Sequence, residues 1–301
     1  FEGSVSSFGS AGENSIYLGG QSIQSNTLES SSYTLSSGYY HFNPTFDDVI
    51  HVDDDAIESI GDGSIFRPFK NIQQGVDAAK EGQLVLVENG VYNENVSVLE
   101  LGEYGIILAS RFYIDGDSSH IENTIINVDV TIGTDSHVYF NGFTLEGDGD
   151  DGIFTIYYGN VTVENLFSRQ YISISESFVN LSNIEINHDE QLLEIQGSSV
   201  NINNVTLKGD VTGEAHVCLW IHDSTINVDN IYITGCNFGV ELNDSGTELI
   251  LNNSILENNN TGIYADLSEV IINNTIMRNN SQAIVKTQGG FLKVNNSNIS
   301  Y

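Results

Sequence analysis

The sequence has little proline, cysteine, methionine, tryptophan and basic charge. Its 301 residues include two Pro, two Cys, one Met and one Trp. Nine Lys and Arg stand against 41 Asp and Glu, which gives a formal net charge of −32. Such an acidic surface repels nucleic acid and anionic membranes, and it suits high salt or the collection of divalent cations. No apolar run approaches the roughly 18 residues of a membrane-spanning helix. We therefore expect neither nucleic acid as a partner nor a membrane span.

The second half of the chain repeats a short pattern: apolar, any residue, apolar, any residue, then Asn or Gly. The fifth position of this pattern falls on Gly142, Asn165, Asn183, Asn204, Asn230, Asn253, Asn274 and Asn296. The steps between these positions are 23, 18, 21, 26, 23, 21 and 22 residues. Alternation with period two predicts a strand. A period near 20 predicts a solenoid, in which each repeat buries its apolar face against its neighbours.

A second segment of the form apolar, any residue, apolar follows the aligned Asn at fixed phase, as at 193–195, 240–242 and 263–265. Two or three short strands in about 22 residues leave room only for tight turns. Like strands of successive coils must therefore stack in parallel, and the sequence predicts an all-β single-stranded solenoid.

This organisation resembles the right-handed parallel β-helix of the pectate-lyase-like superfamily, in which asparagines stack in a ladder at a sharp turn. The resemblance implies an inward ladder made of the seven asparagines at the fifth position. Turn geometry suits Asn, and its amide can bond to the coils on either side. Residues 47–98 also resemble the N-terminal end of archaeal and bacterial secreted surface β-helix proteins. That resemblance rests on Gly61-Asp62-Gly63 and on the stretches 67–73 and 90–96.

We divide the chain into a β-rich N-terminal arm, residues 1–46, and a parallel β-helix, residues 47–301. The arm is rich in Ser and Gly, with short alternating segments. Ile72, Val76 and Ala79 fall on one face of a helix near 69–80, which would cover the open apolar end of the first coil. The chain begins at Phe1 rather than Met. We expect a processed, secreted product in the extracellular medium or at the cell surface.

An acidic, glycine-spaced turn holds the candidate metal ligands Asp148, Asp150 and Asp151. Carboxylates in such a turn are hard oxygen ligands that suit Ca²⁺, and the charge of −32 favours a bound divalent ion. Calcium is therefore the expected cofactor, and a solvated acidic turn is the alternative. The run 53–55 is a similar but weaker cluster.

The catalytic patterns of this superfamily are largely missing. The segment 150–153 resembles the paired-aspartate segment of polygalacturonase-type glycosidases, but the rest of their pattern does not occur. Pectate lyases need a basic residue, typically Arg, near Ca²⁺ carboxylates, and of the four arginines in this chain only Arg169 lies one coil from the Asp150 turn by coil phase. His216 and His222 flank the strand that contains Trp220, and we interpret them as surface residues rather than as a site. We assign no catalytic residue. Some exposed Tyr and Phe side chains could stack on sugar rings.

The sequence leaves two covalent modifications undecided, a disulfide and N-glycosylation. Cys218 and Cys236 are 18 residues apart, and neighbouring coils about 4.8 Å apart are within disulfide reach if the side chains align. Their phases in the repeat differ by several residues, so the pairing is not decided. Among the Asn-x-Ser/Thr sequons, Asn259 and Asn279 are predicted in turns between strands, and they are our candidates for glycosylation.

A non-catalytic extracellular or cell-surface structural protein is the function that these observations favour. The repeat runs on through residues 294–301 without a polar terminal unit, and the arm is too thin to bury a core alone. We expect the arm of one molecule to add strands to the open coil of the next, giving a homopolymer that grows head to tail into a filament or surface layer. The arm could instead fold back on its own β-helix. The alternative functions are a polysaccharide lyase or glycoside hydrolase and a carbohydrate-binding module, since β-helices host all of them.

Overall fold

The computed structural model describes residues 14–18, 21–25, 49–57, 60–100, 105–133, 136–147, 153–209 and 217–300. In the N-terminal arm, β1 (Asn14–Leu18) pairs antiparallel with β2 (Gln21–Ser25). The arm thus contains a β-hairpin, and the other strand-like segments expected there lie outside the described residues.

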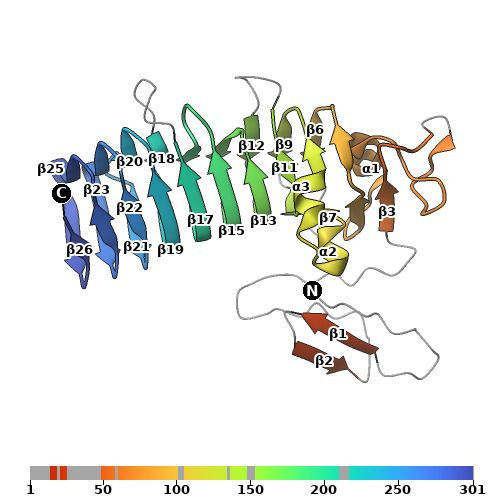
Figure 1. The fold of residues 1–301 in the computed structure, drawn as a ribbon, viewed down its shortest axis with the longest axis horizontal. Helices are drawn as coiled ribbons and strands as arrows, with labels where there is room; N and C mark the ends of the chain where they lie inside the picture. Colours follow the sequence, from red (N-terminus) through yellow and green to blue (C-terminus); the bar gives the residue numbers. More distant parts are fainter. Residues whose placement is uncertain are drawn as a thin grey trace.

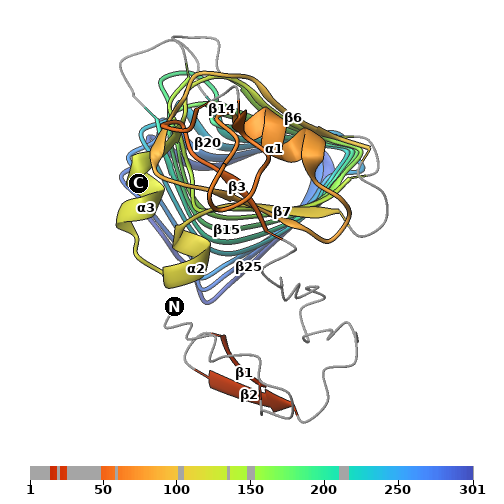
Figure 2. The same cartoon turned by 90° about the vertical axis from the view of Figure 1, so that its right-hand side faces the viewer.

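The remaining strands form a parallel β-helix, which confirms the predicted fold class. Successive coils stack along one axis from β3 to β26 (Figure 1). All of the strand pairings within this stack are parallel among the described residues, and each coil pairs only with the coil before it and the coil after it. Viewed along the axis, the coils superimpose around a single closed core (Figure 2). We name the three sides of the stack faces A, B and C.

Face A consists of β6 (Val96–Leu99), β9 (Val130–Gly133), β12 (Ile153–Tyr157), β14 (Tyr171–Ser175), β16 (Leu193–Gln196), β18 (Val217–His222), β20 (Phe238–Asn243) and the first parts of β23 (Thr261–Asn273) and β25 (Gln282–Asn295). Face B consists of β3 (Val49–Val52), β4 (Leu84–Val87), β7 (Ile106–Ser110), β10 (His137–Asn141), the first parts of β13 (Asn160–Ser168), β15 (Phe178–Asn187), β17 (Ser199–Lys208) and β19 (Thr225–Thr234), β21 (Glu248–Asn252), and the second parts of β23 and β25. Face C consists of β5 (Gly90–Tyr92), β8 (Thr124–Ile126), β11 (Thr144–Leu145), the second parts of β13, β15, β17 and β19, β22 (Ile255–Glu257), β24 (Ile276–Arg278) and β26 (Asn298–Ile299).

The core lies inside the coils and follows from the period-two alternation. In β16, for example, Leu193 and Ile195 point inward and are fully buried, while Glu194 between them is only partly buried. Repeating this on three faces of every coil gives one continuous apolar column. Its largest side chains are aromatic: the Phe140 ring lies 4.6 Å from the Phe143 centroid and 5.2 Å from the Phe154 centroid.

A short helix, α1 (Ile72–Ala78), covers the first coil, at the end of the stack that faces the viewer in Figure 2. Ile72 and Val76 are buried against the core. Gly75 allows the close approach, because a Cβ there would lie 2.7 Å from Cγ2 of Val52. Glu94 caps the helix by accepting hydrogen bonds from the backbone N–H groups of residues 72 and 73. The helix is shorter than the expected three turns, because the chain turns to an extended conformation at residue 79.

Two further short helices, α2 (Phe112–Asp115) and α3 (Ser119–Asn123), stand beside the stack between β7 and β8 (Figure 1). Among the described residues, no helix is long and apolar enough to cross a membrane.

The asparagines at the fifth position of the repeat sit at the bend between faces B and C. Each has a positive φ, between 46° and 62°: Asn165, Asn183, Asn204, Asn230, Asn253, Asn274 and Asn296. Asn tolerates this left-handed conformation better than most residues. The side-chain amide of Asn204 donates to Oδ1 of Asn183 at 2.8 Å, and that of Asn230 donates to Oδ1 of Asn204 at 3.1 Å.

The direction of this ladder differs from the expectation. The side chains of Asn183, Asn204 and Asn230 are exposed, so the ladder runs along the outside of the bend. The reason is the left-handed backbone, which turns the side chain away from the core that the flanking apolar residues fill. Further along, Asn253 donates to Oδ1 of Asp229 instead of to Asn230.

An inward ladder exists elsewhere, at the bend between faces C and A. Asn259 and Asn280 are 3% and 2% exposed. The Asn259 backbone N–H and Nδ2 both donate to Oδ1 of Asn280, at 3.0 and 3.1 Å. Cys236 holds the corresponding position one coil earlier, and its N–H donates to Oδ1 of Asn259.

Candidate functional site

A row of aromatic and acidic side chains follows the outer surface of face A. Because the apolar neighbours point inward, residue 194 on β16, residue 220 on β18, residue 241 on β20 and residue 264 on β23 must point outward. Strand pairing places Glu194 beside Trp220, Trp220 beside Glu241, and Glu241 beside Tyr264. On β14 the residue paired with Glu194 is Ser173, and Tyr171, two residues earlier on that strand, contacts the Glu194 carboxylate through its hydroxyl. We call Tyr171, Glu194, Trp220, Glu241 and Tyr264 the face A strip.

Trp220 is the centre of the strip. Its ring lies 4.3 Å from that of His222 in a T-shaped arrangement, at an interplanar angle of 74°. His222 Nδ1 is 3.2 Å from Oδ2 of Asp244, and the His222 side chain is 22% exposed. Asp223, the acidic residue next to His222 in the sequence, is not its contact. At the β23 end of the strip, Tyr264 is also in contact with an aromatic ring. Phe238 packs against it with ring centroids 5.6 Å apart.

Two ring nitrogens at this centre have no hydrogen-bond partner. They are Nε1 of Trp220 and Nε2 of His222, and both are buried within the described part of the chain. Buried polar atoms are nearly always paired in folded proteins, so such atoms mark positions where a water or a ligand hydroxyl fits.

The two carboxylates of the strip are held in place. Nδ2 of Asn243 donates to Oε1 of Glu241 at 3.0 Å, and the Tyr171 hydroxyl donates to Glu194. Burial raises the pKa of Glu194, and the nearby His222 opposes this shift. Both groups are hydrogen-bond acceptors directed at the outer surface.

The four arginines are paired with carboxylates of neighbouring segments. Arg169 contacts Glu146 at 2.5 Å and Arg111 contacts Glu88 at 2.7 Å. The other two pairs are Arg67 with Asp62 and Arg278 with Glu257. The strip therefore combines aromatic surface with negative charge, which is the arrangement expected for an uncharged hydroxyl-bearing ligand.

A second polar region lies at the N-terminal end of the stack. A pocket of about 300 Å³ is lined by His51, Asp53, Asp55, Ile65, Pro68, Glu88 and Asn89. Carboxylate oxygens of Asp53, Asp54 and Asp55 lie within 4.8 Å of one another. Asp54 accepts the backbone N–H of residue 91 at 3.0 Å, and Asp53 accepts that of residue 55 at 3.0 Å. These carboxylates hold two turns together.

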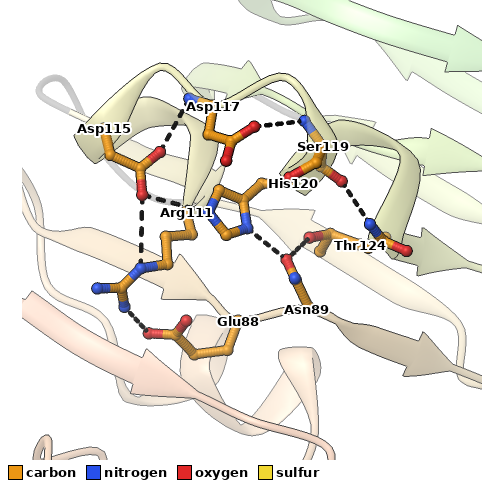
Figure 3. Close-up of polar contacts among 9 residues, drawn as sticks. Glu88, Asn89, Arg111, Asp115, Asp117, Ser119, His120 and Thr124 are labelled. Carbon is orange, nitrogen blue, oxygen red and sulfur yellow. Dashed lines mark hydrogen bonds and ion pairs between the residues drawn. The ribbon is translucent and has the colours of Figure 1, made fainter. Parts of the chain in front are cut away.

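Beside this pocket, a polar network joins α2 and α3 to the first coils (Figure 3). His120 Nδ1 lies 2.7 Å from Oδ1 of Asn89, and its Nε2 lies 3.2 Å from Asp115. Arg111 bridges Glu88 at 2.7 Å and Asp115 at 3.6 Å. Each of these groups is engaged by a neighbour, and the network fixes the helices rather than presenting a free reactive group.

The structure places the predicted site residues as follows. Asp148, Asp150 and Asp151, the predicted calcium ligands, lie outside the described residues, as does His216. Asn279 is exposed, with φ of 55°. Asn259, the other predicted glycan acceptor, is 3% exposed, and its amide is hydrogen-bonded in the inward ladder.

Cys218 and Cys236 form a disulfide with their Cα atoms 5.9 Å apart. The two cysteines differ in their position within the repeat, which left the pairing undecided from the sequence. They meet because residue 236 turns inward beside β18 at the bend before β20.

The strip itself was not assigned from the sequence, although a signal was present. The segments 193–195, 240–242 and 263–265 each enclose one residue between two inward apolar ones. Those enclosed residues are Glu194, Glu241 and Tyr264. Comparing the residues at this position across coils would have identified the strip.

One family model agrees with the architecture. Residues 170–301 match the family model described as right handed beta helix region, a stretch that contains the whole strip. The parallel coils give the fold class that the sequence predicted, a parallel β-helix, and the family match covers the C-terminal part of the stack. Among solved structures, the crystal structure of pectate lyase Pel9A is similar, with a TM-score of 0.40 and 13% identity over 84% of this chain and 78% of that chain. No curated protein matches the sequence.

Proposed function

We propose that this β-helix is a non-catalytic extracellular protein that binds carbohydrate along the face A strip. The observation that carries the proposal is the row in which Trp220 stands between Glu194 and Glu241 on neighbouring coils. An aromatic ring packs against the C–H face of a sugar, and flanking carboxylates accept hydrogen bonds from its hydroxyl groups. The net charge of −32 favours glycans without negative charge.

Two further observations support the non-catalytic and extracellular parts of this proposal. Each arginine is already paired with a carboxylate elsewhere, so none is offered to the strip as a base. The disulfide between Cys218 and Cys236 is of a kind that persists in oxidising compartments.

The test is binding of the whole chain to an array of neutral, basic and acidic glycans, followed by titration of the best ligand. We expect Trp220→Ala to weaken binding about tenfold or more, because one aromatic platform contributes on the order of 1.4 kcal/mol. Phe178→Ala is the matched control, since Phe178 is 69% exposed on face B, away from the strip. Equal losses in both variants, or no glycan bound, would overturn the proposal. Release of shortened or unsaturated products from the bound glycan would show that the protein is an enzyme.

Assembly of copies into a homopolymer is a second candidate function, favoured by the last coil. Val294 occupies an inward position and is 40% exposed, whereas Ile272 at the same position one coil earlier is fully buried. A further coil stacked on β25 would bury this surface, and we propose that a second copy supplies it.

Light scattering and negative-stain microscopy test this second candidate. Val294→Asp should lower the assembly state, and Thr225→Asp on the exposed outer surface of face B should leave it unchanged. Deleting residues 1–46 separates assembly through the N-terminal arm from assembly through the last coil. A truncated chain that assembles like the full-length chain would exclude exchange of the arm, and a monomer would support it.

A further inference from the structure

A second group of aromatic side chains lies on face A, outside the strip. Tyr157 is the last residue of β12, and it points outward because Phe154 and Ile156 before it are fully buried. Tyr158 follows at the bend to face B, with φ of 51°, and is 60% exposed. The two ring centroids are 6.2 Å apart, and the ring planes meet at 83°. We call Tyr157 and Tyr158 the tyrosine pair.

A glycine on the preceding coil makes room for the Tyr157 ring. Strand pairing puts Gly133, at the end of β9, beside Tyr157. A Cβ on Gly133 would lie 2.4 Å from Cζ and 2.5 Å from Cε1 of Tyr157, so the ring lies over the backbone of the coil before it. A glycine within a strand often marks a place where another group approaches closely. Here that group is an aromatic ring, held against the outer surface of face A.

The tyrosine pair and Trp220 lie on the same face, three coils apart, with β12 and β18 along one side of the stack (Figure 1). Strand pairing leads from Tyr157 to Ser175 and from Ser175 to Gln196. Gln196 in turn pairs with His222, whose ring contacts Trp220. Neighbouring coils are about 4.8 Å apart, so about 14 Å along the stack separates the two aromatic sites. The side chains between them are uncharged and can donate and accept hydrogen bonds, which suits a hydroxyl-bearing chain.

We propose that the tyrosine pair is a second subsite for carbohydrate, and that one uncharged oligosaccharide lies along face A from the tyrosine pair to Trp220. This inference rests on the proposed carbohydrate-binding function and specifies the length and position of its ligand. A sugar packs its C–H face against an aromatic ring at each end, and the units between them lie over Ser175 and Gln196. A pyranose unit is about as long as the spacing between coils, about 5 Å, so at least about four units are needed to touch both ends.

Joining the two subsites through one ligand makes affinity depend on length. Once a chain is bound at Trp220, its other end is held close to the tyrosine pair, so the second contact costs little further entropy. A disaccharide reaches only one of the two subsites and lacks this gain.

Isothermal titration of the full chain tests the inference. The probes are the disaccharides to hexasaccharides of cellulose, xylan, mannan and starch, all of them uncharged. Within the series that binds best, affinity should rise at least about tenfold from the disaccharide to the pentasaccharide. One pentasaccharide should bind per chain.

Variants test which rings the ligand touches. Tyr157→Ala should weaken the pentasaccharide about tenfold and leave the disaccharide nearly unchanged, because the disaccharide occupies the larger ring of Trp220. Trp220→Ala should weaken both. Phe66→Ala is the control and should weaken neither, since Phe66 is 92% exposed on a turn near the first coil.

Gly133→Ala tests the position of the Tyr157 ring rather than its presence. The added methyl group overlaps the far end of a flexible side chain, so the ring moves while the strand stays intact. This variant should weaken the pentasaccharide as Tyr157→Ala does, and combining the two should add little, because both remove the same contact. Circular dichroism and melting temperature show that each variant is folded.

The outcomes separate this inference from the proposed function. If Tyr157→Ala leaves the pentasaccharide affinity unchanged, the second subsite is overturned and carbohydrate binding at Trp220 stands. If two pentasaccharides bind per chain, or affinity does not rise with length, the single spanning ligand is overturned. If Gly133→Ala binds like the wild type while Tyr157→Ala does not, the placement of the ring by Gly133 is overturned. If no glycan on the array binds, the inference and the proposed function both fall.

Discussion

Cys218 and Cys236 are bonded across neighbouring coils, with both side chains fully buried in the apolar column. Cys218 lies two residues before Trp220 on β18, and Cys236 lies at the bend that leads into β20. The disulfide therefore ties together the two coils that carry the centre of the strip.

The first prediction concerns this disulfide. Replacing both cysteines by Ala should lower the free energy of unfolding by about 3 kcal/mol, because a crosslink over a loop of this size restricts the unfolded chain. Denaturant unfolding measures the change. Intact mass under non-reducing conditions should be lower than the reduced mass by two hydrogens. Two thiols that alkylate in denaturant without reductant would contradict the pairing.

The second prediction concerns the outer asparagine ladder. Asn204 has φ of 52° and makes two side-chain bonds within the ladder. Asn204→Ala should lower the free energy of unfolding by about 2 kcal/mol, partly from the lost bonds and partly because Ala adopts a positive φ less readily than Asn. Asn204→Gly should cost about 1 kcal/mol, because Gly adopts this conformation without strain. Equal losses in the two variants would show that the backbone conformation contributes little.

The third prediction concerns Glu194. Burial raises its pKa, so the ionised form is disfavoured in the folded state relative to the unfolded chain. The resulting stability is fully present below the ordinary pKa of Glu and is lost as the pH rises through the raised value. Glu194→Gln should therefore melt at the same or a higher temperature than wild type at pH 7, and the two should converge near pH 4.

Glycan affinity separates the role of Glu194 in binding from its effect on folding. The same Glu194→Gln variant should bind glycan more weakly than wild type, although it is at least as stable. Glu248→Gln, on exposed surface of face B, is the matched control and should change neither property. A clear drop in the melting temperature of Glu194→Gln would refute the burial cost.

The fourth prediction concerns glycosylation in a host that modifies sequons. Asn279 is exposed and should carry a glycan, whereas Asn259 should carry none in the folded product, because its amide lies in the inward ladder. Peptide mapping after enzymatic deglycosylation measures both sites. Asn279→Gln should remove the added mass, and a glycan found on Asn259 would contradict its burial.

The fifth prediction concerns calcium. If Asp148, Asp150 and Asp151 bind Ca²⁺, millimolar calcium should raise the melting temperature by about 2–4 °C over excess EGTA, since a ligand stabilises the state that binds it. Replacing the three aspartates by asparagine should abolish this shift. Asp189→Asn is the control, because Asp189 is 76% exposed on a turn. An unchanged melt of the wild-type chain would remove the support for a calcium site.

The sequence predicted the solenoid because period and alternation are properties of spacing alone. It also placed the asparagines at bends, since few residues tolerate that backbone. It did not predict whether the asparagine side chains point into the core or out of it. Asn258 and Asn279 have positive φ and hold equivalent positions, while Asn259 and Asn280 that follow them turn inward. A shift of one residue along the repeat decides whether a sequon asparagine is exposed or buried. Amino-acid composition does not show that shift.

The strip was missed for a related reason. Glu194, Trp220 and Tyr264 are unremarkable as single residues, and the steps between them vary with the length of the connecting bends. Only the pairing of strands shows that they form one row. The disulfide was left open in the same way, because proximity across a bend depends on geometry that residue spacing does not contain.

The position of α1 restricts how copies of this protein can combine. The helix closes one end of the apolar column, so within the described residues coil-on-coil contact is left to the end formed by β25 and β26. Two such ends meet about a twofold axis, which produces a closed pair rather than an open chain. Filament growth, which the sequence suggested, would require a second and different contact surface on each molecule. We propose that the N-terminal arm, residues 1–46, supplies that second surface.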